Sequence, residues 1–169
     1  MDWPGLHEWR EFFLGLLTAE AALIGLLFVV LTIHLRVLTA EGNKALRATA
    51  AAIFMAYLTG LIIAGLALVP QPLPAFGIES FVLITVLFVI GQRRIVHAGL
   101  QAAADTVGRR EFATRSRIYT ALAFPGLAGQ AAMAFGYPAG IAVLAAVVMA
   151  YQVLALLDTW DLVFRAASA

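Results

Sequence analysis

The chain has 169 residues, of which 63% are hydrophobic and 12% are charged. Soluble domains are about half apolar and about a quarter charged, so a water-soluble fold of this chain would have too little polar surface to cover its apolar residues. The absence of cysteine excludes disulfide bonds, thiolate catalysis and zinc sites built on cysteine. The net charge of +1 is uninformative as a total, and only the positions of the charges along the chain carry information.

The apolar residues form long continuous runs instead of stripes at helical spacing. A run of about 17 residues or more, at about 1.5 Å per helical residue, is long enough to cross the hydrocarbon core of a bilayer. The sequence therefore predicts an all-α integral membrane bundle that forms a single domain over residues 1–169. Five transmembrane helices are expected, at about 12–34, 48–69, 76–92, 118–136 and 139–157.

Turn-forming and charged residues mark the ends of these spans. Three prolines between residues 70 and 74 remove backbone donors and end the second helix. Arg93 and Arg94 end the third span, and residues 136–138, Gly-Tyr-Pro, separate the last two. Because these last two spans are close to the minimum length for a crossing, a re-entrant hairpin is an alternative.

Basic residues predict the side that each loop faces, because Lys and Arg in short loops stay on the cytoplasmic side. The loops after the first and third spans are basic, and Arg165 follows the fifth span. The loops at 70–75 and 137–138 carry no charge. We therefore expect a multi-pass protein of a bacterial cytoplasmic (inner) membrane, with its N-terminus outside and its C-terminus inside.

The segment 93–117 is predicted to be a cytoplasmic basic loop. Its apolar residues recur at helical spacing, so we expect the third span to continue into it as a helix that Gly108 interrupts. Each basic residue near an anionic membrane surface contributes about 1 kcal/mol, which favours anionic lipid over nucleic acid as a partner. The candidate lipid-binding residues are Arg93, Arg94, Arg109, Arg110, Arg115 and Arg117.

Small residues at every fourth position predict faces on which helices approach closely, since helices in lipid associate by packing of their backbones. Such packing joins helices within one chain or between copies, and the sequence leaves both open. We expect a homo-oligomer. The predicted packing residues are Gly25 in the first span, Ala52, Ala56, Gly60 and Ala64 in the second, and Ala142, Ala146 and Ala150 in the fifth.

Glu20 lies about two turns inside the first span, where an ionisable group costs about 2.5–3.5 kcal/mol unless a partner, water or a proton compensates it. Other polar residues fall at a similar depth in the outer half. We hypothesise a vestibule for cations or protons, open to the outside and lined by Glu20, Glu79, Gln130, Thr59 and Thr18. The alternative is a protonated Glu20 that shares a hydrogen bond and is purely structural.

A second polar group is expected near the inner ends of the spans, at His34, Gln152 and Asp158. The spacing of Asp158 and Asp161 from Arg165 predicts pairing along one helix. His34 is interpreted as either a titratable group or a satisfied interfacial histidine. No cofactor, metal site or catalytic set is indicated by the residue pattern, so an enzyme is not expected.

Residues 21–36, Ala-Ala-Leu-Ile-Gly-Leu-Leu-Phe-Val-Val-Leu-Thr-Ile-His-Leu-Arg, and the helix end Leu68-Val69-Pro70 resemble a family of small bacterial multipass proteins. Some members of that family carry the label "modulator of FtsH protease". The resemblance covers about the first 70 residues and implies a regulatory role without catalytic residues. Glu20 stands where the family has a small residue, and His34 stands where it often has Asn.

Two functions are therefore expected from the sequence. The leading one is a homo-oligomeric ion pathway with Glu20 and Glu79 at its outer mouth. The alternative is a non-conducting regulatory subunit that binds another membrane protein, such as a membrane protease.

Overall fold

The computed structural model describes residues 5–40, 43–102 and 106–167, without the side chains of 44–45, 92, 94–112 and 165–167. Over this part of the chain every regular element is an α-helix. The helices are α1 Arg10–Ile33, α2 Leu35–Thr39, α3 Lys44–Leu68, α4 Leu73–Ala102, α5 Thr106–Ala134 and α6 Ala139–Ala167. The prediction of an all-α protein is thus confirmed.

Four of the helices, α1, α3, α4 and α6, contain stretches that are long and apolar enough to cross a membrane. The helix α5 is as long as α6, but its first part carries the basic residues around position 110. Its apolar part, residues 118–134, includes Pro125, Gly126, Gly129 and Gln130, which lower its overall apolarity. The fold is therefore compatible with a multi-pass membrane protein, with α5 as the least apolar helix.

The helices are longer than the predicted spans. The third span continues as a helix to Ala102, as expected, but α5 already begins at Thr106 and runs through Gly108. The expected interruption at Gly108 is thus wrong, since glycine weakens a helix interior without necessarily breaking it. The segment 93–117 is largely helical instead of a loop, and α6 extends beyond residue 157 to Ala167.

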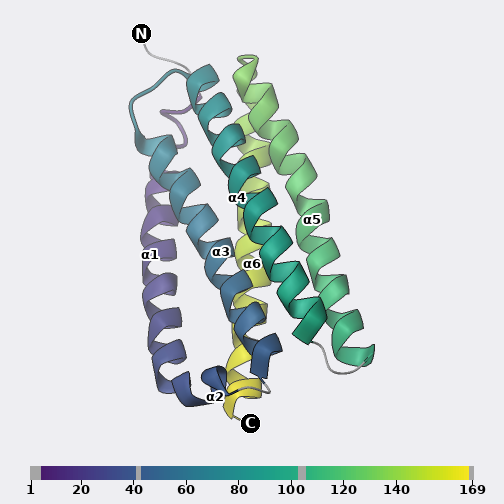
Figure 1. Cartoon of the computed structure of the whole chain (residues 1–169). Coiled ribbons are helices and arrows are strands. Elements are labelled where there is room, and N and C mark those ends of the chain that lie inside the picture. Colours follow the sequence, from purple (N-terminus) through teal and green to yellow (C-terminus); the bar gives the residue numbers. More distant parts are fainter. Residues whose placement is uncertain (1–4, 41–42, 103–105, 168–169) are drawn as a thin grey trace.

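The turn between α5 and α6 is built on Gly136. The residue has a φ of 83°, in the left-handed region that glycine adopts without steric cost. Its N–H donates to Met133 O at 2.8 Å, and the N–H of Tyr137 donates to Ala132 O at 3.0 Å. These two bonds form the Schellman motif that ends many helices. Both helices run the length of the bundle (Figure 1).

Four helices close into a ring. The helix α3 packs against α4, α4 against α5, α5 against α6, and α6 back against α3, while α1 packs along the outside of α3. The two chain ends lie at opposite ends of the bundle (Figure 1). The turn at 69–72 and the turn at 135–138 lie at the N-terminal end, whereas α2, the start of α3, the end of α4 and the start of α5 lie at the C-terminal end.

Two buried apolar clusters fill the bundle, one toward each end. The cluster toward the N-terminal end includes Phe13, Leu16, Ile63, Phe76, Met133 and Val148. The cluster toward the C-terminal end includes Leu27, Ile53, Ala56, Tyr57, Ala155 and Leu162. Along α1, α3 and α6, residues 17–23, 57–63 and 148–155 form the junction between the clusters.

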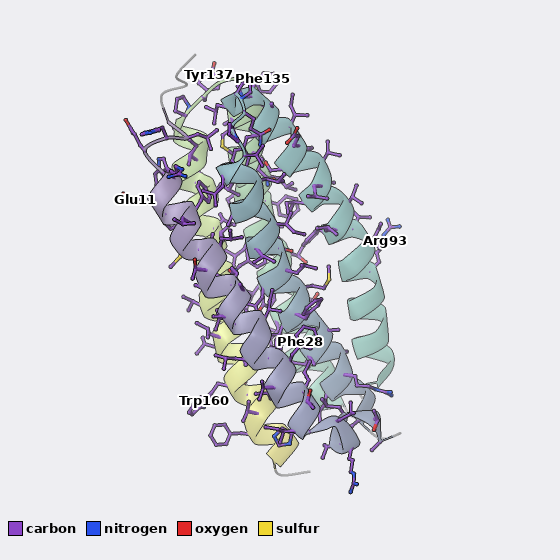
Figure 2. All side chains as sticks on the ribbon, turned by 90° about the vertical axis from the view of Figure 1, so that its left-hand side faces the viewer. Glu11, Phe28, Arg93, Phe135, Tyr137 and Trp160 are labelled. Carbon is purple, nitrogen blue, oxygen red and sulfur yellow. The ribbon has the colours of Figure 1, made fainter. Side chains whose placement is uncertain are left out.

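The outer surface of the bundle is also apolar. Large side chains such as Phe28, Phe135 and Trp160 point away from the bundle (Figure 2), and Phe135 is 82% exposed. Large exposed apolar side chains occur on four of the long helices, α1, α4, α5 and α6. A soluble monomer rarely exposes apolar surface on this scale, whereas hydrocarbon solvates it.

Glycines allow the closest approaches between helices. A Cβ atom on Gly77 of α4 would lie 2.8 Å from the Gln130 carbonyl oxygen of α5, and one on Gly129 would lie 2.9 Å from the Gly140 carbonyl oxygen of α6. Of the predicted packing residues, Ala56, Gly60 and Ala64 are buried and Ala52 is half-buried. By contrast, Gly25, Ala142 and Ala146 are exposed and Ala150 is half-buried, so these rows face outward from the single chain.

We predict that Gly77→Ala destabilises the bundle, because the added Cβ would meet only backbone atoms of α5, which cannot move aside as a side chain can. Overpacking of this kind costs about 1–3 kcal/mol, which outweighs the gain of up to about 1 kcal/mol in helix propensity. Thermal unfolding of the purified protein in mild detergent, followed by circular dichroism, measures the loss.

Gly25→Ala is the matched control, because nothing lies within 4 Å of the position of its added Cβ. Its unfolding midpoint is expected to stay equal or rise, since alanine favours the helix. An equal loss in both variants would contradict the close contact at Gly77.

Candidate intramembrane site

A carboxyl group and a carboxamide meet in the middle of the bundle. A Cβ atom on Gly60 of α3 would collide with Glu20 Oε1 and Gln152 Nε2, and would lie 2.9 Å from Glu20 Cδ. Glu20 comes from α1 and Gln152 from α6, and both side chains are buried. The missing side chain of Gly60 thus lets these two polar groups reach the same point. That point lies at the junction between the two apolar clusters.

The polar atoms of this layer have no hydrogen-bond partners among the described residues. This holds for both carboxyl oxygens of Glu20 and for the side-chain oxygen and nitrogen of both Gln130 and Gln152. A buried polar group without a partner costs about 1–3 kcal/mol. Three such side chains are unusual for a folded interior, so they define the candidate site.

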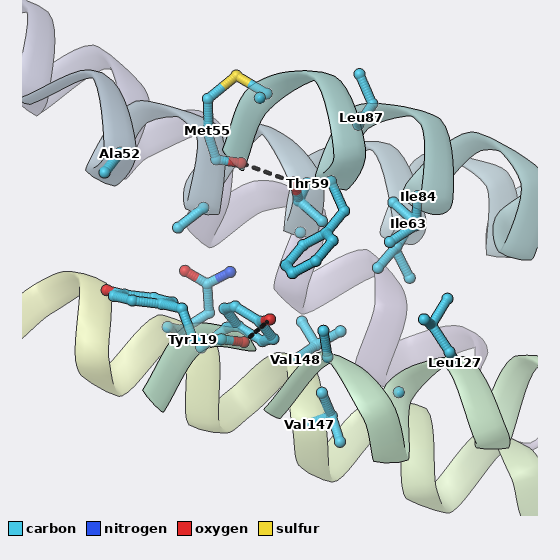
Figure 3. A pocket seen from close by; sticks show the side chains of 18 of the residues that line it. Ala52, Met55, Thr59, Ile63, Ile84, Leu87, Tyr119, Leu127, Val147 and Val148 are labelled. Atoms are coloured by element: carbon cyan, nitrogen blue, oxygen red, sulfur yellow. Dashed lines mark hydrogen bonds between the residues drawn. The ribbon is translucent and has the colours of Figure 1, made fainter. Parts of the chain in front are cut away.

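A cavity of about 130 Å³ lies inside the ring of α3, α4, α5 and α6. In Figure 3, α3 and α4 pass on one side of it and α5 and α6 on the other. Most of its lining is aliphatic. The polar side chains on its wall include Thr59, Gln130, Gln152 and Tyr119, and the backbone of Gly60 also lines it. The cavity therefore adjoins the point at which Glu20 and Gln152 approach Gly60.

An ionic cluster lies where the cavity approaches the C-terminal end of the bundle. The guanidinium of Arg115 on α5 donates to both Asp158 and Asp161 on α6. The Tyr119 hydroxyl donates to Asp158 Oδ2 at 2.9 Å. Arg115 and Asp158 also line the cavity. Two carboxylates face one guanidinium here, so these three side chains carry a net negative charge.

Hydroxyl groups extend this cluster along the helices. The Tyr151 hydroxyl donates to the backbone oxygen of Tyr119 at 2.5 Å. Tyr57 and Thr159 share a hydrogen bond of 2.9 Å between their hydroxyls. This network was not predicted from the sequence. The signal that was available is the spacing of Asp158 and Asp161, which share a helix face opposite an arginine of the preceding helix.

The structure brings together only part of the predicted vestibule. Thr59 and Gln130 line the cavity, and the Thr59 hydroxyl donates to Met55 O at 2.7 Å. Thr18 is exposed and bonded to its own helix at Leu14 O, and Glu79 is exposed on α4. Neither of these two residues faces Glu20, because each lies on the outward side of its helix.

The predicted inner group is divided as well. Gln152 lies beside Glu20 instead of with His34, because α6 crosses α3 at Gly60. His34 is half-buried at the break between α1 and α2, where its N–H donates to Val30 O at 3.1 Å. Asp158 pairs with Arg115, and the expected partner Arg165 lies outside the described side chains.

The predicted lipid-binding arginines are only partly described. Arg93 points away from the bundle (Figure 2), and Arg117 is exposed. Arg115 is held in the ionic cluster, which gives it a role within the bundle. Arg94, Arg109 and Arg110 lie outside the described side chains. Among the side chains that are described, no group of three acidic, histidine or cysteine residues could hold a metal ion.

Comparison of the chain with protein-family models, with curated proteins and with solved structures finds no match. The resemblance of the first 70 residues to the FtsH-modulator family therefore stays a prediction.

We predict that Arg115→Ala lowers the free energy of unfolding by about 1–3 kcal/mol, because it leaves the largely buried Asp158 without its guanidinium partner. Because Asp161 is partly exposed to solvent, the loss of unfolding free energy should be smaller than for a fully buried ion pair. Thermal unfolding in detergent measures the change.

Arg117→Ala removes the same charge from an exposed position two residues away and serves as the control. Its stability is expected to change by less than about 0.5 kcal/mol. Equal effects of the two variants would show that the ionic cluster does not contribute specifically.

Proposed function

We propose that this protein provides a pathway for protons or small cations through its own helical bundle. The observation that carries the proposal is the set of three buried polar side chains without partners among the described residues, Glu20, Gln130 and Gln152, in or beside one cavity. Ionisable groups at such depth are expensive in a membrane and typically mark proton or ion routes. The route would lie inside the ring α3–α6 and not on the axis of an oligomer.

The charges along this route favour positive species. Asp158 and Arg115 line the cavity, and two further carboxyl groups lie behind its wall, Glu20 next to Gln152 and Asp161 next to Arg115. An anion entering the cavity would meet this excess of acidic groups, whereas a proton or small cation would be attracted to it. The cavity links Gln130 and Gln152 to the ionic cluster at the C-terminal end.

The outer half of the route is closed by the apolar cluster around Phe13, Phe76 and Met133. Passage from the N-terminal side therefore requires a movement of helices in this cluster. The expected outer mouth at Glu79 does not form part of this route, since Glu79 points outward. This arrangement favours a gated pathway over an open pore.

We also propose that all five long helices cross a bacterial cytoplasmic membrane with the N-terminus outside. The positions of the chain ends at opposite ends of the bundle support an odd number of crossings. The basic residues of 36–47 and 93–117 belong to the C-terminal end, which the positive-inside rule assigns to the cytoplasm.

We predict that reporter fusions place the two termini in different compartments. A reporter active only in the cytoplasm is expected to work at the C-terminus and in the 102–106 connection, and to fail at the N-terminus. The same reporter signal from both termini would show an even number of crossings. It would contradict the assignment of the N-terminus to the outside and the C-terminus to the cytoplasm.

We predict that Glu20→Gln lowers proton or cation flux at least tenfold in vesicles that contain the purified protein. The substitution keeps the shape of the side chain and removes its ability to carry a charge, so the bundle should still fold. A pH-sensitive dye inside the vesicles reports proton flux, and a potassium gradient tests the cation alternative.

Glu11→Gln, on the exposed start of the same helix, is the control and is expected to conduct as the natural protein does. A loss in Glu79→Gln would favour the outer vestibule inferred from the sequence. Unchanged flux in Glu20→Gln, or wild-type flux no higher than that of empty vesicles, would rule out the pathway.

A second candidate function is favoured by the outward rows of small residues, Gly25 on α1 and Ala142 and Ala146 on α6. Small residues allow close backbone approach to a helix of another copy or another protein. The chain would then be a non-conducting regulatory subunit, as its resemblance to the FtsH-modulator family implies. Absence of flux together with co-purification of a larger membrane protein would favour this function.

A further inference from the structure

We propose that the cavity inside the ring α3–α6 binds a small uncharged molecule with a flat apolar body and one hydrogen-bonding group, of the phenol type. This goes beyond the proposed pathway and does not depend on it, because it concerns occupancy of the cavity and not flux. It rests on the volume of the cavity, its walls and the side chains directed into it.

The volume matches a single aromatic ring. The cavity measures about 130 Å³. Apolar protein cavities of about 150 Å³ stay dry and take up benzene. The lining residues extend over 49–63 of α3 and 115–130 of α5, so the cavity is elongated and one ring would occupy part of its length.

The walls favour an apolar body. All four helices contribute aliphatic side chains or methionine, among them Met55, Ile84, Leu87, Leu127, Val147 and Val148 (Figure 3). Water beside these side chains would lose hydrogen bonds that the wall cannot replace. A flat hydrocarbon ligand has no hydrogen bonds to lose at this wall, and it gains dispersion contacts on both of its faces.

The polar side chains on the cavity wall favour a ligand with one hydrogen-bonding substituent. Gln130 and Gln152 line the cavity and are 1% and 6% exposed, and neither carboxamide has a partner among the described residues. A carboxamide both donates and accepts, so a hydroxyl group, which also does both, can pair with either amide atom. Such a bond would remove the cost of an unsatisfied buried amide.

The charges disfavour an anionic ligand. The guanidinium of Arg115 is engaged by Asp158 and Asp161, and Glu20 lies next to Gln152. A carboxylate or phosphate in the cavity would therefore be desolvated next to acidic groups. A neutral ligand avoids this penalty.

Small residues on the wall create the space, which makes the cavity easy to fill by substitution. Ala52 on α3 and Ala123 on α5 both line it. The outward-facing Ala146 on α6 does not line it and is exposed, so it offers the same substitution outside the cavity.

The test uses 4-fluorophenol as the probe and fluorobenzene as its comparator, with the full-length protein in detergent and fluorine NMR as the readout. Saturable binding of 4-fluorophenol is expected in the natural protein. Ala123→Leu or Ala52→Leu is expected to weaken it at least tenfold, and Ala146→Leu is expected to leave it unchanged. Thermal unfolding shows which of the filled variants remain folded, and either one suffices.

Gln130→Leu tests the hydrogen bond. It should weaken 4-fluorophenol binding severalfold and leave fluorobenzene binding equal or stronger. The absence of saturable binding in the natural protein, or equal binding in the filled variants, would overturn the site. Equal affinity for the two probes that Gln130→Leu does not change would overturn the polar part of the proposal.

Discussion

The whole arrangement depends on the enclosure of one carboxyl group, that of Glu20, by protein. In hydrocarbon such a group is strongly disfavoured, so the face of α1 that carries it has to turn inward. That face meets α3 at Gly60, where any side chain would displace the carboxyl group. The same gap admits Gln152 from α6. One missing side chain thus fixes the rotation of three helices and brings their polar groups to one depth.

The sequence predicted the helices well because the signals that end them are local. The prolines of 70–74 separate α3 from α4, and Gly136 supplies the left-handed turn before α6. The sequence predicted poorly how each helix is rotated about its own axis. Lipid and the protein interior are equally apolar, so no polar stripe distinguishes the face of a helix toward lipid from its face toward protein. On α6, for example, Leu144 is buried and Val143 is exposed. Thr18 and Glu79 were therefore assigned to a vestibule that they do not face, whereas Gln152 was separated from the Glu20 that it meets.

The composition of α5 follows from its position in the ring. One side of this helix lines the cavity with Gly126, Leu127 and Gln130, and another packs against α4 and α6 through backbone contacts. Small and polar residues suit both purposes, and large aliphatic residues would fill the space or separate the helices. The least apolar long helix, α5, is thus the one whose inward face has to leave room for both the cavity and close backbone contacts. Its polarity is therefore compatible with its place in the bundle.

Glu20 and Gln152 lie between two groups of contacts that differ in kind. The cluster around Phe13 and Met133 lies toward the N-terminal end of the bundle, and Arg115 joins α5 to α6 through two aspartates toward the other end. The first consists of apolar side chains that are buried in protein and held by close packing, whereas the second is a partly exposed ion pair held by charge.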